Sequence, residues 1–158
     1  MPDILDFVRY PYDRGRNMNA EQTLRSYADA FNRAALDDLV AHYADVTEYH
    51  QPFLPTPLTS PHTIHEFESS MFAAFSDVHV EIEWMVSDGK LASAGMLIRA
   101  VHTAEMPTPT GVLAATGNPI AIASAEFIEI DDAGRIICHR RYQDTGQLMA
   151  QLHLQTSA

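Results

Sequence analysis

The sequence has only one cysteine, Cys138, and few basic residues for its length. One cysteine excludes an intrachain disulfide, and inside an expected strand a buried, unreactive thiol is its commoner role. The ten Lys and Arg residues are outnumbered by 21 Asp and Glu residues, which gives a formal net charge of −11. Arg140 and Arg141 form the one adjacent basic pair. We therefore expect no nucleic acid partner and no membrane partner.

Signals for export, membrane insertion and cofactor binding are missing as well. The N-terminus, residues 1–6, has an acidic start without an apolar core of signal-peptide length, and no apolar run approaches a membrane span. We therefore expect a cytoplasmic protein. The sequence contains no Gly-x-Gly-x-x-Gly fingerprint and no Gly-x-Ser-x-Gly elbow. Dinucleotide binding and nucleophilic serine chemistry thus have no support, and we expect no cofactor.

The histidines show no spacing that is typical of a metal site. His62 and His65 are three residues apart, Glu66 follows them, and His50 lies upstream. A zinc site needs three or four converging ligands, and this spacing matches no compact zinc motif. We therefore expect no metal.

The length of 158 residues fits one domain. Pro11 and Gly15 interrupt any regular element in residues 1–18, which we interpret as an extended arm. Residues 19–158 are then expected to form a single domain.

The first half of this domain has helical patterns. Asn19 and Gln22 fit a capping box at the start of a first helix, and residues 36–43 continue the apolar stripe in a second, short helix. After a short strand that ends at His50, several prolines predict a stiff loop. Thr63 and Glu66 repeat the capping box, which predicts a third helix over residues 63–75.

The second half has strand patterns. Strands are expected over residues 79–86, 91–101 and 120–130, followed by a last strand, and residues 104–119 are expected to form a long loop. Helices followed by an antiparallel meander are typical of an α+β fold, here a strongly bent, mainly antiparallel sheet with three N-terminal helices. The strand over 91–101 is apolar on both faces, which predicts a homodimer through the outer face of the sheet.

The last strand carries the first candidate for chemistry. Residues two apart share a face, so Arg140, Tyr142 and Asp144 point one way while His139 and Arg141 point the other. With the face of Tyr142 turned inward, the Asp144 carboxylate would be presented as a general acid or base. Asp144 could instead cap the following turn or pair with Arg140.

His102 is the second candidate, because it ends the strand over 91–101 just before the long loop. Asp144 also ends a strand, so both residues could reach one concave mouth and divide acid and base roles. A buried histidine bonded to a backbone carbonyl is the alternative. Further residues that could line such a pocket are Arg140, Tyr142, Asn32, Trp84, Phe127 and His50.

Several motifs, in this order, resemble the SnoaL-like polyketide cyclase family, which has the cone-shaped nuclear transport factor 2-like fold. They are Tyr49-His50-Gln51-Pro52, Ala74-Phe75-Ser76-Asp77, Val101-His102-Thr103, Ala115-Thr116-Gly117-Asn118-Pro119, Ala133-Gly134-Arg135-Ile136, and Asp144 followed by Gln151-Leu152. The resemblance covers about residues 20–153. Two departures are Arg140, where the family often has Trp, and a longer loop after His102.

The resemblance implies a cofactor-free polyketide (ester) cyclase, a lyase or isomerase that closes a ring by intramolecular aldol chemistry on a small apolar carbonyl compound. It implies that Asp144 is the general acid/base and that His102 lines the same pocket. A non-catalytic binding or interaction domain of the same fold is the alternative. A ketosteroid-isomerase-like enzyme or an epoxide hydrolase is less favoured, since the latter needs two carboxylates and an arginine around a water, and the sequence nominates only Asp144 and Arg140.

Overall fold

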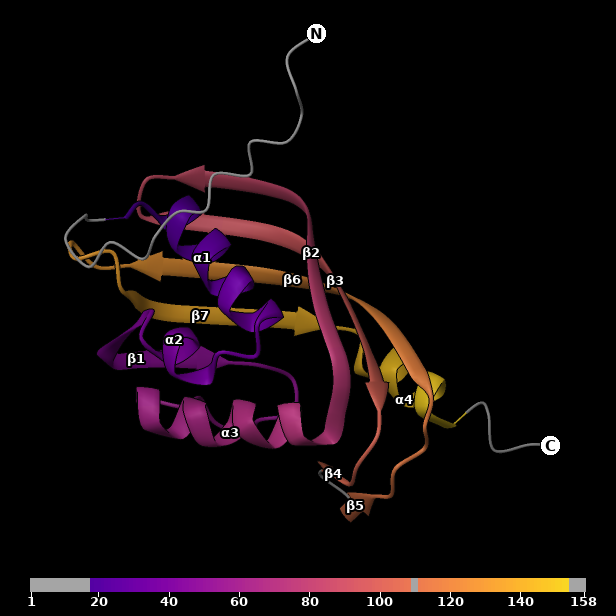
Figure 1. Cartoon of the computed structure of the whole chain (residues 1–158). Coiled ribbons are helices and arrows are strands. Elements are labelled where there is room, and N and C mark those ends of the chain that lie inside the picture. Colours follow the sequence, from indigo (N-terminus) through magenta and orange to yellow (C-terminus); the bar gives the residue numbers. More distant parts are fainter. Residues whose placement is uncertain (1–17, 109–110, 154–158) are drawn as a thin grey trace, which may run out of the picture.

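The computed structural model describes residues 18–108 and 111–153, so the predicted arm over residues 1–18 lies outside the described residues except for Met18. Figure 1 shows the arrangement of the helices and strands. In chain order they are α1 (Ala20–Asn32), α2 (Leu36–Val40), β1 (Tyr43–His50), α3 (Pro61–Ala74), β2 (Phe75–Asp88), β3 (Leu91–His102), β4 (Met106–Thr108), β5 (Gly111–Leu113), β6 (Pro119–Ile130), β7 (Ile136–Gln143) and α4 (Thr145–His153).

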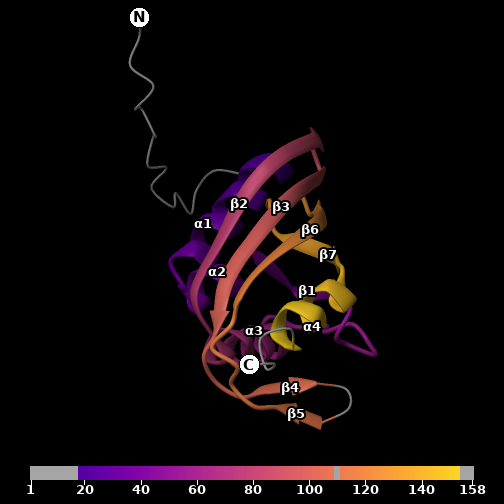
Figure 2. The same ribbon diagram turned by 90° about the vertical axis from the view of Figure 1, so that its right-hand side faces the viewer.

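Five of the strands form one sheet in the order β1-β7-β6-β3-β2. β1 pairs parallel to β7, and the other neighbours pair antiparallel. The long strands β2, β3 and β6 curve strongly, as Figures 1 and 2 show from two sides. The predicted α+β fold with a bent, mainly antiparallel sheet is thus confirmed. Within the predicted loop over residues 104–119, β4 and β5 form a short hairpin.

Helices α1, α2 and α3 cover one face of this sheet because each has an apolar side to bury. Leu24, Leu39 and Ile64, one from each helix, join a core with Met96 and Ile128 of the sheet. A second cluster, around Ile120 and Leu148, packs α4 against the N-terminal end of β6. Among the described residues, no helix has both the length and the apolar character that a membrane span requires.

Capping chemistry sets the helix starts. The predicted capping box of α1 is present, with Gln22 N donating to Asn19 Oδ1 at 2.9 Å and Asn19 N donating to Gln22 Oε1 at 3.1 Å. The predicted start of α3 at Thr63 was wrong. Ser60 is the N-cap and Pro61 occupies the first turn, where its missing N–H has no cost. The second helix is also shorter than predicted, because Tyr43 begins β1.

The turn at Gly134 attaches α1 to the β6–β7 end of the sheet. Gly134 has φ +78°, and a Cβ there would lie 2.8 Å from Met18 O. Its own carbonyl accepts a hydrogen bond from Thr23 Oγ1 at 3.0 Å. Gly89, in the β2–β3 turn, has a similar φ of +57° but nothing within 4 Å of an added Cβ.

We therefore expect Gly134→Ala to destabilise the fold more than Gly89→Ala. Gly89→Ala adds only the backbone strain of a left-handed residue, about 1–2 kcal/mol. Gly134→Ala adds the same strain and also displaces the backbone at Met18. Urea denaturation of both variants measures the difference, and equal losses would show that the contact with Met18 contributes nothing.

Candidate functional site

A cavity of about 90 Å³ lies between α3, the inner face of the sheet and α4. This is several times the roughly 10–15 Å³ that holds one water molecule. Its walls are mostly apolar, and its polar side chains are Gln51, Glu68, Arg141 and Gln143. A broader hollow on the surface near Arg99 and Gln151 opens to solvent and has no buried charge. The cavity lined by Glu68 and Arg141 is therefore the candidate site.

Arg141 is the centre of a buried charge network beside this cavity. Its Nε donates to Oε1 of Glu126 at 2.8 Å, its Nη1 reaches Oε1 of Glu68 at 3.5 Å, and its Nη2 reaches the Tyr27 hydroxyl at 3.3 Å. All four side chains are buried. Burial alone would lower the pKa of Arg141, but the charge of Glu126 outweighs it and raises that pKa well above its usual value. The guanidinium therefore stays charged between two carboxylates.

Glu126 is held on all sides by donors. Besides Arg141, it accepts hydrogen bonds from Ser124 Oγ at 2.9 Å and from His139 Nε2 at 2.6 Å. Burial would raise the pKa of Glu126, but the Arg141 charge and these hydrogen bonds lower it to about 2. The other ring nitrogen of His139, Nδ1, lies 2.7 Å from the Tyr43 hydroxyl, so this ring links Tyr43 to Glu126.

Glu68 is the carboxylate that lines the cavity. The Tyr49 hydroxyl donates to its Oε1 at 2.8 Å, and the contact with Arg141 goes to the same oxygen. Among the described residues, these are its hydrogen bonds, so Oε2 is free to accept another. Gln51 also lines the cavity, and its buried Nε2 has no hydrogen-bond partner among the described residues. The cavity thus offers one acceptor and one unsatisfied donor to a ligand.

Local periodicity explains why these residues point inward. Ile122, Ser124, Glu126 and Ile128 alternate along β6, and this face is buried while the residues between them are exposed or half-buried. Glu68 lies one turn after Ile64 and one turn before Phe72 on α3. Neither glutamate was predicted from the sequence as a site residue. A charged residue inside an otherwise apolar stripe was the signal that could have identified them.

The prediction that the face of β7 carrying Arg140 and Tyr142 points inward was wrong. His139 and Arg141 are buried on the inner face, whereas Arg140 and Tyr142 lie on the outer face, where Tyr142 is 54% exposed. Trp84 and Phe127, which were expected as pocket walls, are also outside, 51% and 44% exposed. None of these four predicted pocket residues lines the cavity.

Asp144 and His102 do not line the cavity either. Asp144 is exposed, and its Oδ1 accepts from Gln147 N at 2.9 Å, so it caps α4 as the alternative interpretation held. His102 is fully buried, with Nδ1 3.1 Å from the Thr116 hydroxyl. Burial lowers the pKa of His102. Phe75, which does line the cavity, packs against the His102 ring with a centroid distance of 5.2 Å.

The two remaining predicted residues have partners of their own. Asn32 bonds the backbone of Val80 twice, donating from Nδ2 to the carbonyl at 2.9 Å and accepting from the amide at 2.6 Å, so it fixes α1 to β2. His50 lies at the end of β1, half-buried, with Nε2 3.0 Å from Glu48 Oε2. Neither lines the cavity.

Comparison with known sequences identifies one family. The model of the SnoaL-like polyketide cyclase family matches residues 21–152 of the chain. A search of curated proteins found no match.

Solved structures that resemble this chain share its fold at low sequence identity. A presumed polyketide cyclase from Xanthomonas campestris has a TM-score of 0.72 and 19% identity, over 84% of this chain and 96% of that one. A protein of ketosteroid isomerase-like fold from Catenulispora acidiphila, in complex with trimethylamine, has a TM-score of 0.68 and 17% identity, over 82% of this chain and 91% of that one. An LEH-like epoxide hydrolase of M. tuberculosis has a TM-score of 0.63 and 16% identity, over 84% of this chain and 88% of that one.

The lowered pKa of Glu126 predicts how stability depends on pH. Because its folded value, about 2, lies below its ordinary value of 4.5, its contribution is complete above pH 4.5 and is lost as the pH falls toward 2. The shift corresponds to a loss on the order of 3 kcal/mol across that window. In Glu126→Gln this part of the acid dependence should disappear, measured as unfolding free energy against pH.

At neutral pH, Glu126→Gln should also lower the free energy of unfolding by about 3–5 kcal/mol, because the buried charge of Arg141 then has one carboxylate partner fewer. Glu129→Gln is the matched control, since Glu129 is exposed on the opposite face of β6. An acid dependence that stays the same in Glu126→Gln would contradict the network's role.

Proposed function

Because the chain belongs to the SnoaL-like polyketide cyclase family, we propose that it closes a ring in a small apolar carbonyl compound by cofactor-free acid/base catalysis. The observation that supports this most is that the Glu68 carboxylate and the amide of Gln51, which has no partner among the described residues, line the same largely apolar cavity. The predicted assignment of the proton transfer to Asp144 is revised accordingly, because Asp144 lies outside that cavity.

In the proposed reaction, Glu68 removes a proton from the carbon beside a substrate carbonyl, which gives an enolate and a neutral Glu68. The enolate carbon then attacks a second carbonyl of the same molecule, so that a carbon–carbon bond forms and an alkoxide develops. Glu68 returns its proton to this alkoxide, which completes an intramolecular aldol addition with no net loss of atoms. A positioned carboxylate can serve both steps when it lies within hydrogen-bond reach of the substrate.

Negative charge that develops on the enolate oxygen needs a donor nearby. The Nε2 group of Gln51 fits this role because it is buried and has no other partner among the described residues. Arg141 is a positioning residue in this scheme. Its nitrogens bond Glu126, Glu68 and Tyr27, so it holds Glu68 in place and adds positive charge beside it.

The cavity walls limit the substrate class. Phe31, Phe67 and Phe72 supply aromatic surface, and Ile98 and Ile122 supply aliphatic surface. A volume of about 90 Å³ suits a compound of few non-hydrogen atoms. A small, largely apolar carbonyl compound with its oxygen toward Gln51 satisfies these walls.

Glu68→Gln tests the proposal, with small linear diketones as substrates and ring closure followed by NMR. Turnover should fall by about 10²-fold or more, because the amide keeps the shape of Glu68 but cannot accept the proton. Gln51→Met, of similar volume, should lower kcat through loss of the oxyanion donor, and it keeps the test valid if Glu68→Gln folds poorly. Asp144→Asn should leave turnover near the wild-type rate.

Loss of turnover in Asp144→Asn, with wild-type rates in Glu68→Gln and Gln51→Met, would restore the assignment predicted from the sequence. If no diketone is converted but apolar ligands bind the wild type and all three variants alike, the chain is a binding domain. Exchange of the carbonyl-adjacent protons for deuterium in D₂O offers a second readout, because it reports proton removal without ring closure.

An epoxide hydrolase is the second candidate, and one observation favours it. The sequence nominated only one carboxylate and one arginine for this reaction, but Arg141 lies between Glu68 and Glu126, which gives two carboxylates and an arginine. Against it, Glu126 does not line the cavity and is engaged by three donors. Formation of a diol from small epoxides, lost in Glu68→Gln, would favour this reaction over ring closure.

The predicted homodimer has a candidate surface on the outer face of the sheet. Trp84, Gly95, Ala125 and Tyr142 follow one another across β2, β3, β6 and β7 in register. The indole of Trp84 lies over Gly95, within 2.0 Å of where a Cβ would be. Phe127 packs edge-on against Tyr142 at 5.8 Å. Two exposed aromatic ridges thus flank a row of small residues, a shape that two copies can fill reciprocally.

We expect the wild type to have the mass of a dimer in light scattering at micromolar concentration, and Phe127→Lys to shift it to the monomer. A charge in the centre of an apolar interface is costly to bury. Val112→Lys is the control, because Val112 is even more exposed than these aromatics but lies on the β4–β5 hairpin. A wild type that stays monomeric would refute the interface.

A further inference from the structure

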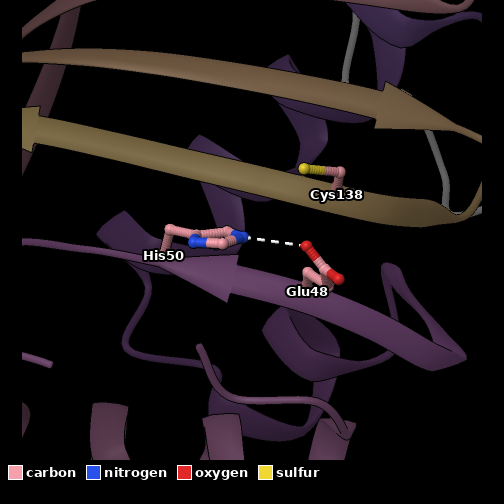
Figure 3. A group of neighbouring side chains, drawn as sticks. All are labelled: Glu48, His50 and Cys138. Atoms are coloured by element: carbon pink, nitrogen blue, oxygen red, sulfur yellow. Dashed lines mark hydrogen bonds and ion pairs between the residues drawn. The ribbon is translucent and has the colours of Figure 1, made fainter. Parts of the chain in front are cut away.

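Three side chains of metal-binding type gather at the edge of the sheet, away from the cavity. They are Glu48 and His50 of β1 and Cys138 of β7 (Figure 3). Glu48 pairs directly with Cys138 in the parallel ladder, and His50 follows two residues later on the same face. One ligand atom from each residue lies within 4.8 Å of the others.

This cluster is on the opposite side of the sheet from the charge network. Tyr49 and His139, which pair with each other between the cluster residues, are fully buried on the inner face, with ring centroids 5.0 Å apart. Glu48 is exposed, and His50 and Cys138 are half-buried, so an ion from solvent can reach all three. Nothing in the proposed reaction uses them.

We propose that Glu48, His50 and Cys138 bind a divalent transition-metal ion, with zinc as the best fit. Thiolate, imidazole and carboxylate are the three ligand types that zinc takes in proteins. A thiolate and a carboxylate together supply two negative charges, which balance the charge of the ion. Three protein ligands leave a fourth tetrahedral position for water or for another side chain.

The spacing is close to what zinc requires. In a tetrahedral site with Zn–S near 2.3 Å and Zn–N or Zn–O bonds of about 2.0–2.2 Å, two ligand atoms lie roughly 3.3–3.7 Å apart. The present limit of 4.8 Å exceeds this spacing by about 1 Å. Rotation of the exposed Glu48 side chain can supply that movement, because its contact is a single hydrogen bond from His50 Nε2 at 3.0 Å.

Two neighbours complete the surroundings of the proposed site. Glu129 of β6 is the register partner of Cys138 on its other side, so it shares that face of the sheet and is near enough to approach the fourth position. Arg140 also lies beside Cys138, two residues along β7 on the same face. Arg140 is exposed, so its guanidinium can move aside when an ion binds.

A bound ion would join the edge strand β1 to β7 just after the irregular part of their ladder. The register of this ladder shifts between Tyr43 and Glu48, so few backbone pairs hold β1 in place. Ligands from both strands would bridge them. Metal binding should therefore also raise the thermal stability of the chain, since an ion that binds only the folded state stabilises it.

The test is a titration of the reduced, untagged full chain with Co²⁺ and then Zn²⁺. Co²⁺ should bind one per chain with a near-ultraviolet thiolate-to-cobalt charge-transfer band, which Zn²⁺ then removes. Cys138→Ser should abolish the band, and His50→Ala and Glu48→Gln should each weaken Zn²⁺ binding at least 10-fold. Zn²⁺ should raise the melting temperature of the wild type but not of these variants.

His62→Ala is the matched control. His62 and Glu66 form an exposed histidine–glutamate pair with an N–O distance of 3.5 Å but no thiol, and the change should leave binding intact. No charge-transfer band in the wild type, or zinc binding that survives all three cluster variants, would overturn the proposal. Zinc binding that is lost in His62→Ala instead would show an adventitious surface ion only. None of these outcomes depends on whether the cavity is catalytic.

Discussion

The burial of one guanidinium constrains the rest of this structure. A charge in the interior is tolerated only when it is paired and hydrogen-bonded, and Arg141 meets that requirement with groups from three different elements. Glu126 comes from β6, Glu68 from α3 and Tyr27 from α1. The hydrogen bonds that pair the Arg141 guanidinium therefore hold α1 and α3 against the sheet. Arg141 and Glu68 also form part of the polar wall of the cavity.

The order of the elements followed from local signals in the sequence, but the inward face of β7 did not. Apolar alternation normally reveals which face is buried, and residues 139–142 have none, since His, two Arg and Tyr fit either face. The prediction followed the aromatic Tyr142. The deciding facts were the partners Glu126 and Glu68, 15 and 73 residues away in sequence from Arg141. Such pairing is set by tertiary structure and leaves no local pattern.

The candidate site was misplaced for the same reason. Asp144 was expected in the pocket because it continues the face of Tyr142, so one wrong face displaced Arg140, Tyr142 and Asp144 together. Glu126 and Glu68 were recoverable in part, because each interrupts an apolar stripe at helical or strand spacing. Gln51 was not, since it follows the last strand residue and precedes a proline loop where periodicity carries no information.

The three-donor cage around Glu126 also has a consequence for how such a protein can diverge. Exchanging Arg141 alone leaves two carboxylates in the interior without their cation, and exchanging Glu126 alone removes the nearer carboxylate partner of Arg141, so single substitutions at these two positions are strongly destabilising. The phenylalanines and aliphatic residues across the cavity carry no such linkage and can be exchanged one at a time. Within this lineage, ligand preference should therefore change through the apolar wall while the ionic wall stays as a unit.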